Sequence, residues 1–258
     1  MKKAKTILIV VHILVVAGFG SFIYWKFFHD QKEAAPQAVS LEKVISGNAA
    51  ASVLNNEEGT VMTVGLKAPE ELNLDLPFYA QAPFANWDMP WQEACEEASV
   101  LLVANGYYKH NWTKEQFNDE ILKLVEWEKN EFGDYKHTTV EQTAQILKKY
   151  LKLDSVIHDN PGFEEVKNTL ARGHVIVMTF AGKHIGNPNY KNGGPIYHAM
   201  VIKGYKADDK IITHDVGTRK GEDYVYSWST LQNALHDWAE PIEGGAKKMI
   251  EVLPPDGF

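Results

Sequence analysis

The sequence predicts an α+β fold: N-terminal helices packed on a C-terminal antiparallel sheet, preceded by one transmembrane helix. Three observations predict it. Residues 6–25 form one long apolar run. Helical periodicity and capping signals occupy residues 94–172, and β-rich runs separated by turns occupy residues 174–253. Helices followed by strands, rather than alternating with them, are typical of an α+β domain.

The chain of 258 residues divides into three predicted regions. Residues 1–30 are the membrane anchor, 31–71 a linker or stalk, and 72–258 the folded domain. The last region has about 185 residues, enough for one domain with a sizeable core.

The anchor prediction depends on Thr6–Trp25, which carries no charge apart from a protonated His12. About 20 apolar residues span the ~30 Å hydrocarbon core. Lys2, Lys3 and Lys5 precede the run, which favours a cytoplasmic N-terminus and an extracytoplasmic domain at the cell membrane. A cleaved signal peptide is the alternative. Its apolar region is shorter, whereas bulky aromatic residues close this one. Both interpretations place the domain outside.

The linker contains QKEAAPQAVS, NAAAS and NNEEG, without sustained periodicity. This composition is typical of a flexible stalk. Residues 61–66 could form a short strand.

Charge and cysteine count exclude two classes of protein. The formal net charge is −8; without the four lysines of residues 1–28, 22 basic and 34 acidic residues remain. An acidic domain is a poor phosphate binder, so no nucleic-acid partner is expected. A single cysteine forms no internal disulfide. It is either a reactive thiol or a small buried hydrophobic residue.

The folded domain opens with an extended segment at 74–79. A helix at 94–105 follows, with an apolar inward stripe and Gly106 at its end. Capping boxes open two further helices, Thr113 with Gln116 and Thr138 with Glu141, and Pro161 opens a fourth. Strands are predicted in the runs HVIVMTFA, YHAMVIKGYKA, KIITHDVG, EDYVYSW and KKMIEVLP, with a short helix at 229–238.

Cys95 is the candidate nucleophile. It lies at the start of the 94–105 helix, where unpaired N–H groups and the helix dipole favour a thiolate. Glu96 and Glu97 oppose this effect, and we expect them to point outward. A thiol nucleophile also needs a basic partner.

His198 and Asp215 are the candidate partners, on the strands YHAMVIKGY and ITHDVG. If these strands are neighbours and antiparallel, Asp215 can orient the imidazole and stabilise its cation. His214 should face the other side of its strand. For the oxyanion, Gln81 is the predicted side-chain donor and Gln92 the fallback.

These segments resemble a known family. LPFYAQAPFANWDMPWQEACEEAS, YHAMVIKGYK and ITHDVGTRKGEDYVYSW are similar to bacterial papain-like peptidases related to the double-glycine bacteriocin-processing peptidases. The similarity covers about residues 74–253. It implies a papain-like fold, a Cys–His–Asp triad and an oxyanion glutamine, roles that fall on Cys95, His198, Asp215 and Gln81. No cofactor or metal is implied.

The chain departs from the better-known members at two points. Glu96 follows the cysteine where they have glycine, and the glutamines lie 14 and 3 residues before it rather than about six. The predicted region also lacks a transporter portion.

Hydrolysis of a peptide or amide bond in a peptide or cell-envelope substrate is therefore the leading prediction. An inactive peptide-binding or scaffold domain of the same fold and a thioester-forming acyltransferase are the alternatives. Metal dependence through His184, His198, His214 and Asp215 lacks the spacing of known metal motifs.

Overall fold

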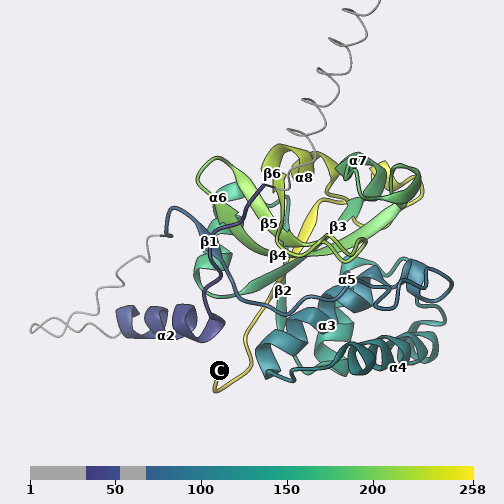
Figure 1. Ribbon diagram of the computed structural model, residues 1–258, viewed down its shortest axis with the longest axis horizontal. Coiled ribbons are helices and arrows are strands. Elements are labelled where there is room, and N and C mark those ends of the chain that lie inside the picture. Colours follow the sequence, from purple (N-terminus) through teal and green to yellow (C-terminus); the bar gives the residue numbers. More distant parts are fainter. Residues whose placement is uncertain (1–32, 53–67) are drawn as a thin grey trace, which may run out of the picture. The chain divides into compact units, whose positions relative to one another are not determined.

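The structure is a computed structural model that describes residues 33–52 and 68–258 (Figure 1). Ala35–Phe258 form one compact unit. Within the described residues, none of the helices combines the length and the apolar character that a membrane span requires. The predicted anchor at 6–25 and the predicted strand at 61–66 lie outside the described residues.

A seven-stranded antiparallel sheet forms the centre of the domain. Its order is β2-β7-β3-β4-β5-β6, and β1 pairs with β4 beside this path. The strands are β1 (Leu72–Asn73), β2 (Ser155–Asp159), β3 (Val175–Ala181), β4 (Tyr197–Lys206), β5 (Lys210–His214), β6 (Tyr224–Ser227) and β7 (Lys248–Val252).

The helices lie before, between and after the strands. They are α2 (Leu41–Ser52), α3 (Cys95–Tyr108), α4 (Lys114–Phe132), α5 (Val140–Gln145), α6 (Phe163–Ala171), α7 (Gly182–Ile185) and α8 (Trp228–Ala234), with a π-helical turn η2 (Ile146–Tyr150) and the 3₁₀ turns η1 (Trp91–Glu93), η3 (Lys191–Gly193) and η4 (Ile242–Gly244). Figure 1 shows α3, α4 and α5 on one side of the sheet and α7 and α8 on the other.

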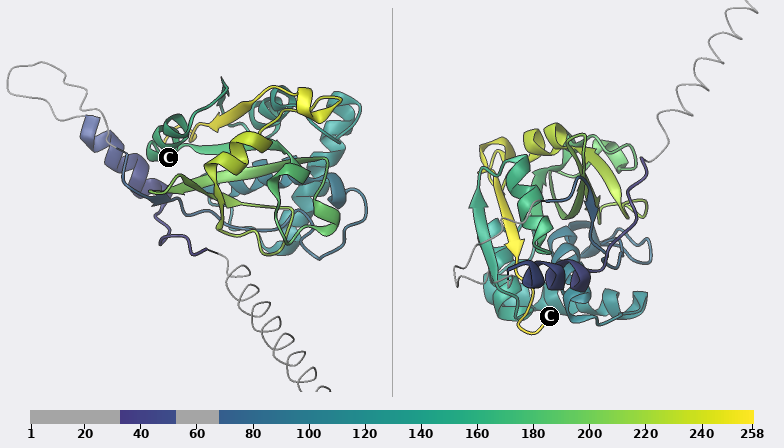
Figure 2. Two further views of the ribbon diagram at one scale, coloured as in Figure 1. Left: turned by 90° about the horizontal axis from the view of Figure 1, so that it is seen from above. Right: turned by 90° about the vertical axis from the view of Figure 1, so that its left-hand side faces the viewer.

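The central strands β3 and β4 are covered by other elements on both faces of the sheet (Figure 2). All seven residues of β3 and nine of the ten in β4 are buried. This explains why their sequences are almost continuous apolar runs rather than alternating ones. The predicted α+β fold with helices on an antiparallel sheet is confirmed.

Helix α3 differs from its prediction. It buries 12 of its 14 residues, so it has no single inward stripe. Gly106 does not end the helix; it lies inside it, and a Cβ there would be 2.2 Å from Leu76 Cδ2. Glycine is needed for this close approach. The helix ends instead at Lys109, whose φ of 51° is left-handed.

Smaller differences concern boundaries. The capping box of Thr113 and Gln116 is present, but the second box is formed by Thr139 and Gln142, one residue later than predicted. Strand β2 was not predicted, because it is a short edge strand whose five residues are all partly or fully exposed.

Part of the predicted linker belongs to the domain. Val39 N donates to Asn73 O (2.7 Å), and Leu41 at the start of α2 is only 4% exposed. Asn48 Nδ2 donates to Ala171 O (2.8 Å), and a Cβ on Gly173 would be 2.5 Å from Ile45 Cγ1. Residues 35–52 are therefore held against the domain rather than forming a stalk. Their apolar contacts are few and widely spaced, so local periodicity does not reveal them.

Candidate active site

Cys95 is the first residue of α3 and is almost fully buried, at 5% exposed. Helix α3 packs on β4, and the backbone N–H of Ala199 on that strand lies against the sulfur and favours the thiolate. Burial acts in the opposite direction and is the largest effect, so the pKa of the thiol is raised well above its usual value.

Glu96 is the second cause of that rise, and its position corrects the sequence prediction. Glu96 and Glu97 are both buried, at 1% and 0% exposed, rather than pointing outward. The Cys95 thiol donates to Glu96 Oε2 at 2.8 Å. Burial raises the pKa of Glu96 to about 7. The first turn of α3 is packed against other elements, so Glu96 and Glu97 are buried, and Cys95 is the residue of this turn that lines the cleft.

His198 and Asp215 meet as expected from neighbouring antiparallel strands. His198 is the second residue of β4, and Asp215 directly follows β5, which pairs with β4. His198 Nε2 and Asp215 Oδ1 are 2.8 Å apart, with both side chains almost completely buried. The neighbouring imidazole, together with donated hydrogen bonds, keeps the pKa of the carboxyl below its usual value despite burial.

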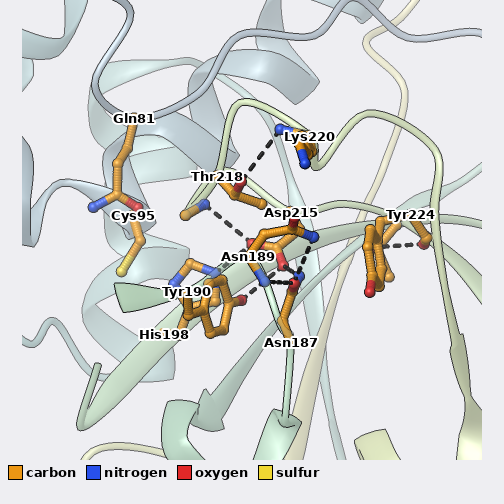
Figure 3. Close-up of polar contacts among 12 residues, drawn as sticks. Gln81, Cys95, Asn187, Asn189, Tyr190, His198, Asp215, Thr218, Lys220 and Tyr224 are labelled. Carbon is orange, nitrogen blue, oxygen red and sulfur yellow. Dashed lines mark hydrogen bonds and ion pairs between the residues drawn. The ribbon is translucent and has the colours of Figure 1, made fainter. Parts of the chain in front are cut away.

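Three further side chains, none of them predicted from the sequence, donate hydrogen bonds to Asp215. Asn187 Nδ2, Tyr190 Oη and Tyr226 Oη donate to Oδ2 at 2.8, 2.7 and 2.5 Å. The Tyr190 ring also packs edge-on against the imidazole of His198, with centroids 5.4 Å apart. Asp215 is thus a fully satisfied carboxylate (Figure 3). Asn187 and Tyr190 lie in the loop after α7, whereas Tyr226 lies on β6, so no single local motif marks the three residues.

A glycine allows the loop after Asp215 to approach the imidazole. Gly217 N donates to Asp215 Oδ1 at 3.1 Å. A Cβ on Gly217 would be 2.8 Å from His198 Cε1. Any other residue at 217 would push the loop or the ring away.

The two candidate glutamines lie in different environments. Gln81 is buried, and its Nε2 donates to the carbonyls of Trp91 (2.9 Å) and Gln92 (3.1 Å). Its Oε1 has no hydrogen-bond partner among the described residues. Gln81 N donates to Val216 O, which ties this segment to the residue after Asp215. The Gln92 side chain is exposed and bonds to Glu93.

One cleft of about 790 Å³ brings the candidate residues together. Cys95, His198, Gln81 and Gln92 all line it. The Cys95 side chain and the His198 ring lie beside each other across α3 and β4, with Gln81 next to Cys95 (Figure 3). The volume of the cleft lies in the range of known ligand sites, and exposed residues such as Lys191 and Arg219 line its outer part.

The other histidines considered lie elsewhere. His214 Nε2 donates to Leu76 O (3.0 Å) and its Nδ1 accepts from Asp223 N (3.2 Å), so it faces away from the cleft. His184, on α7, lies with its Nε2 3.7 Å from Oε1 of Glu243 in η4. In the described part of the chain, no group of three or more His, Cys, Asp or Glu is placed to hold a metal ion.

The comparison with protein families assigns the chain to a class. The Peptidase_C39 like family matches residues 73–241, more than half of the 258 residues. The chain belongs to this family of C39-like cysteine peptidases, so the resemblance inferred from the sequence is confirmed at this level. No curated protein matches the chain.

Two solved structures are similar to the chain at low sequence identity. A candidate C39-like peptidase from Bacillus anthracis is 16% identical, with a TM-score of 0.48, covering 72% of this chain and 99% of that one. Xylellain, a cysteine protease from Xylella fastidiosa, is 13% identical, with a TM-score of 0.47, covering 79% of this chain and 91% of that one.

Proposed function

We propose that the protein is a cysteine peptidase with Cys95 as nucleophile, His198 as general base and acid, and Asp215 as the orienting carboxylate. One observation carries the proposal. The chain's single cysteine, at a helix start, lines the same cleft as a buried imidazole that is already fixed by a carboxylate 2.8 Å away. Nucleophile, base and orienting group in this order are the parts of a catalytic triad.

The proposed reaction uses the two nitrogens of His198 differently. Nε2 is held by Asp215, so Nδ1 takes the thiol proton as the Cys95 sulfur attacks the carbonyl carbon. His198 then gives this proton to the leaving amine as the C–N bond breaks. Water attacks the thioester and gives its proton to His198, the C–S bond breaks, and the acid leaves with the thiol restored.

The oxyanion site would consist of the Cys95 N–H and Gln81. The Gln81 carboxamide lies next to Cys95 and is fixed by the adjacent carbonyls of Trp91 and Gln92. Both N–H groups of Gln81 are donated to these carbonyls in the resting structure, so Gln81 would have to exchange one of these bonds for a substrate oxygen when the oxyanion forms. Gln92 is exposed and is the weaker candidate.

The resting contact between Cys95 and Glu96 must break before reaction. The sulfur donates to Glu96 Oε2, so the thiol has to rotate about its Cα–Cβ bond toward His198. Protonation of Glu96 weakens its hold on the thiol, because a neutral carboxyl is a weaker acceptor.

The same contact favours one alternative function, an inactive peptide-binding or scaffold domain. A buried thiol with a raised pKa and an acidic neighbour is a poor nucleophile. Acyl transfer would use the same thioester and differs only in the acceptor.

Location remains part of the proposal. The apolar run at 6–25 and the lysines before it support a membrane anchor with the domain outside the cytoplasm. A peptide or cell-envelope substrate follows from that location.

The test is covalent capture. The full-length chain is incubated with a peptide library and cell-wall fragments, and adducts are located by mass spectrometry. We expect a thioester on Cys95 in wild type, none in Cys95→Ala, and accumulation of adduct in His198→Ala offered activated esters. A wild-type protein that cleaves no substrate and forms no adduct supports the inactive domain instead. Products joined to an added amine indicate transfer.

A further inference from the structure

The cleft that contains Cys95 and His198 is lined by several positively charged side chains, although the protein as a whole is acidic. Lys191, Arg219 and Lys220 line the cleft, and all three are exposed. Glu93 is the one acidic residue among those that line it. The chain as a whole has a net charge of −8, so this local excess of cations runs against the overall composition.

In the described part of the chain, Lys191, Arg219 and Lys220 are not neutralised by acidic side chains. Within residues 33–52 and 68–258, none of them forms an ion pair with an acidic side chain. Most other exposed lysines differ, for example Lys123 with Glu120 and Lys149 with Glu131. Cationic groups left without an acid at the edge of a cleft are available to a ligand.

Both segments that carry these cations flank His198. Lys191 follows Tyr190, whose ring packs on the imidazole. Arg219 and Lys220 follow Gly217, where an added Cβ would be 2.8 Å from Cε1 of the same ring. The loop holding Thr218 and Lys220 lies above Asp215 on the His198 side of the site (Figure 3).

The chemistry tells which part of a peptide would lie there. His198 protonates the leaving amine, so the segment on the carboxyl side of the broken bond must pass along the His198 side of the cleft. The acyl segment is bonded to Cys95 and extends the other way.

We infer that the cleft selects peptides with a carboxylate in the leaving segment, bound by Lys191, Arg219 and Lys220. This inference rests on the proposed function for its direction along the peptide. The carboxylate comes either from an Asp or Glu side chain or from a free C-terminus, since both present the same charged oxygens to Lys and Arg.

Binding to the full-length Cys95→Ala protein tests the charge preference without requiring catalysis. The probes are three hexapeptide mixtures with an uncharged methoxycoumarin label on the N-terminus, randomised over uncharged residues except where stated. One has a single fixed Glu and an amidated C-terminus, one has no acid and a free C-terminus, and one is neutral and amidated. We expect roughly tenfold tighter binding of at least one carboxylate mixture, lost at high salt, because exposed ion pairs contribute modestly and are screened.

Variants that remove the positive charges test whether the preference for carboxylate peptides arises in the cleft. Lys191→Gln combined with Arg219→Gln and Lys220→Gln should bind all mixtures alike. Lys114→Gln combined with Lys123→Gln, two changes on α4 outside the cleft lining, should retain the preference. Equal binding of all three mixtures to the Cys95→Ala parent, or an unchanged preference in the triple variant, overturns the inference.

The direction along the peptide is read from cleavage by wild type. Cleaved products should carry the acid on the carboxyl side of the broken bond, and an acid confined to the amino side overturns that assignment. A protein that binds carboxylate peptides and cleaves none retains the charge preference and loses the proposed function, so the two failures are distinct.

Discussion

Replacing Glu96 by Gln should make Cys95 far more reactive at alkaline pH. The Glu96 Oε2 atom is 2.8 Å from the Cys95 sulfur, and both groups are buried. Gln keeps the size and an acceptor oxygen while removing the charge. The variant thus separates the effect of charge from that of packing.

The expected size follows from Coulomb's law. Two unit charges ~4 Å apart interact by about 4 kcal/mol at an effective dielectric constant of about 20. This corresponds to roughly three pH units in the midpoint of thiol ionisation. Burial raises the pKa of Glu96 to about 7, so its carboxyl is charged only above that pH. The two proteins should therefore react alike below about pH 6 and diverge above pH 7.

The assay is the second-order rate of iodoacetamide alkylation as a function of pH, with the adduct on Cys95 verified by mass spectrometry. The midpoint in Glu96→Gln should lie about three pH units below that of wild type. Glu93→Gln is the control. The charge of Glu93 raises the pKa of Glu96, but its side chain makes no hydrogen bond to the Cys95 sulfur. Midpoints within half a unit of each other would refute the view that Glu96 suppresses the thiolate.

Three further predictions concern stability. Burial raises the pKa of Glu96 to about 7 and of Glu128 to about 8, above the usual 4.5, so the folded state holds protons that the unfolded chain releases. In urea unfolding, the free energy of unfolding should fall by roughly 3 kcal/mol per group between pH 5 and pH 8.5, and by less in Glu96→Gln. A free energy of unfolding that does not change over this pH range would contradict the prediction. Asp223→Ala should cost ~1.5–3 kcal/mol in urea unfolding, because the buried Lys203 ammonium loses its Asp223 acceptor at 2.5 Å and keeps only Asn73 Oδ1. Adding Lys203→Met should restore most of the loss, and additive losses in the double variant would contradict this coupling. Tyr226→Phe removes a donor to the buried Asp215 and should cost ~1.5–3 kcal/mol in denaturation and slow any peptide cleavage, whereas Tyr224→Phe should change neither.

Sequence patterns predicted the layers and the order of the site residues. The β-rich runs gave five of the strands, and their antiparallel pairing brings His198 to Asp215. The capping box at Thr113 was correct, whereas near Thr138 two overlapping matches fit the same pattern and the structure uses Thr139 with Gln142. Features decided by local chemistry are therefore accessible without coordinates.

What the sequence did not predict depends on contacts between distant segments. Glu96 and Glu97 are polar residues in a first helical turn, where exposure is the usual outcome. Their burial results from α3 being surrounded by other elements. In the same way, Tyr226 reaches Asp215 from β6 and Asn187 from a loop, and neither position has a recognisable motif.

The contacts of residues 35–52 set a practical boundary for recombinant work. A fragment starting at residue 72 would lack Leu41, the bond from Val39 to Asn73, and the side chain of Ile45 that faces Gly173. Such a fragment would expose apolar surface that α2 covers and would leave the edge of β1 without its partner. A fragment meant to retain the whole compact unit should therefore start at or before Ala35, so that α2 and the segment leading into it stay in place as part of the fold.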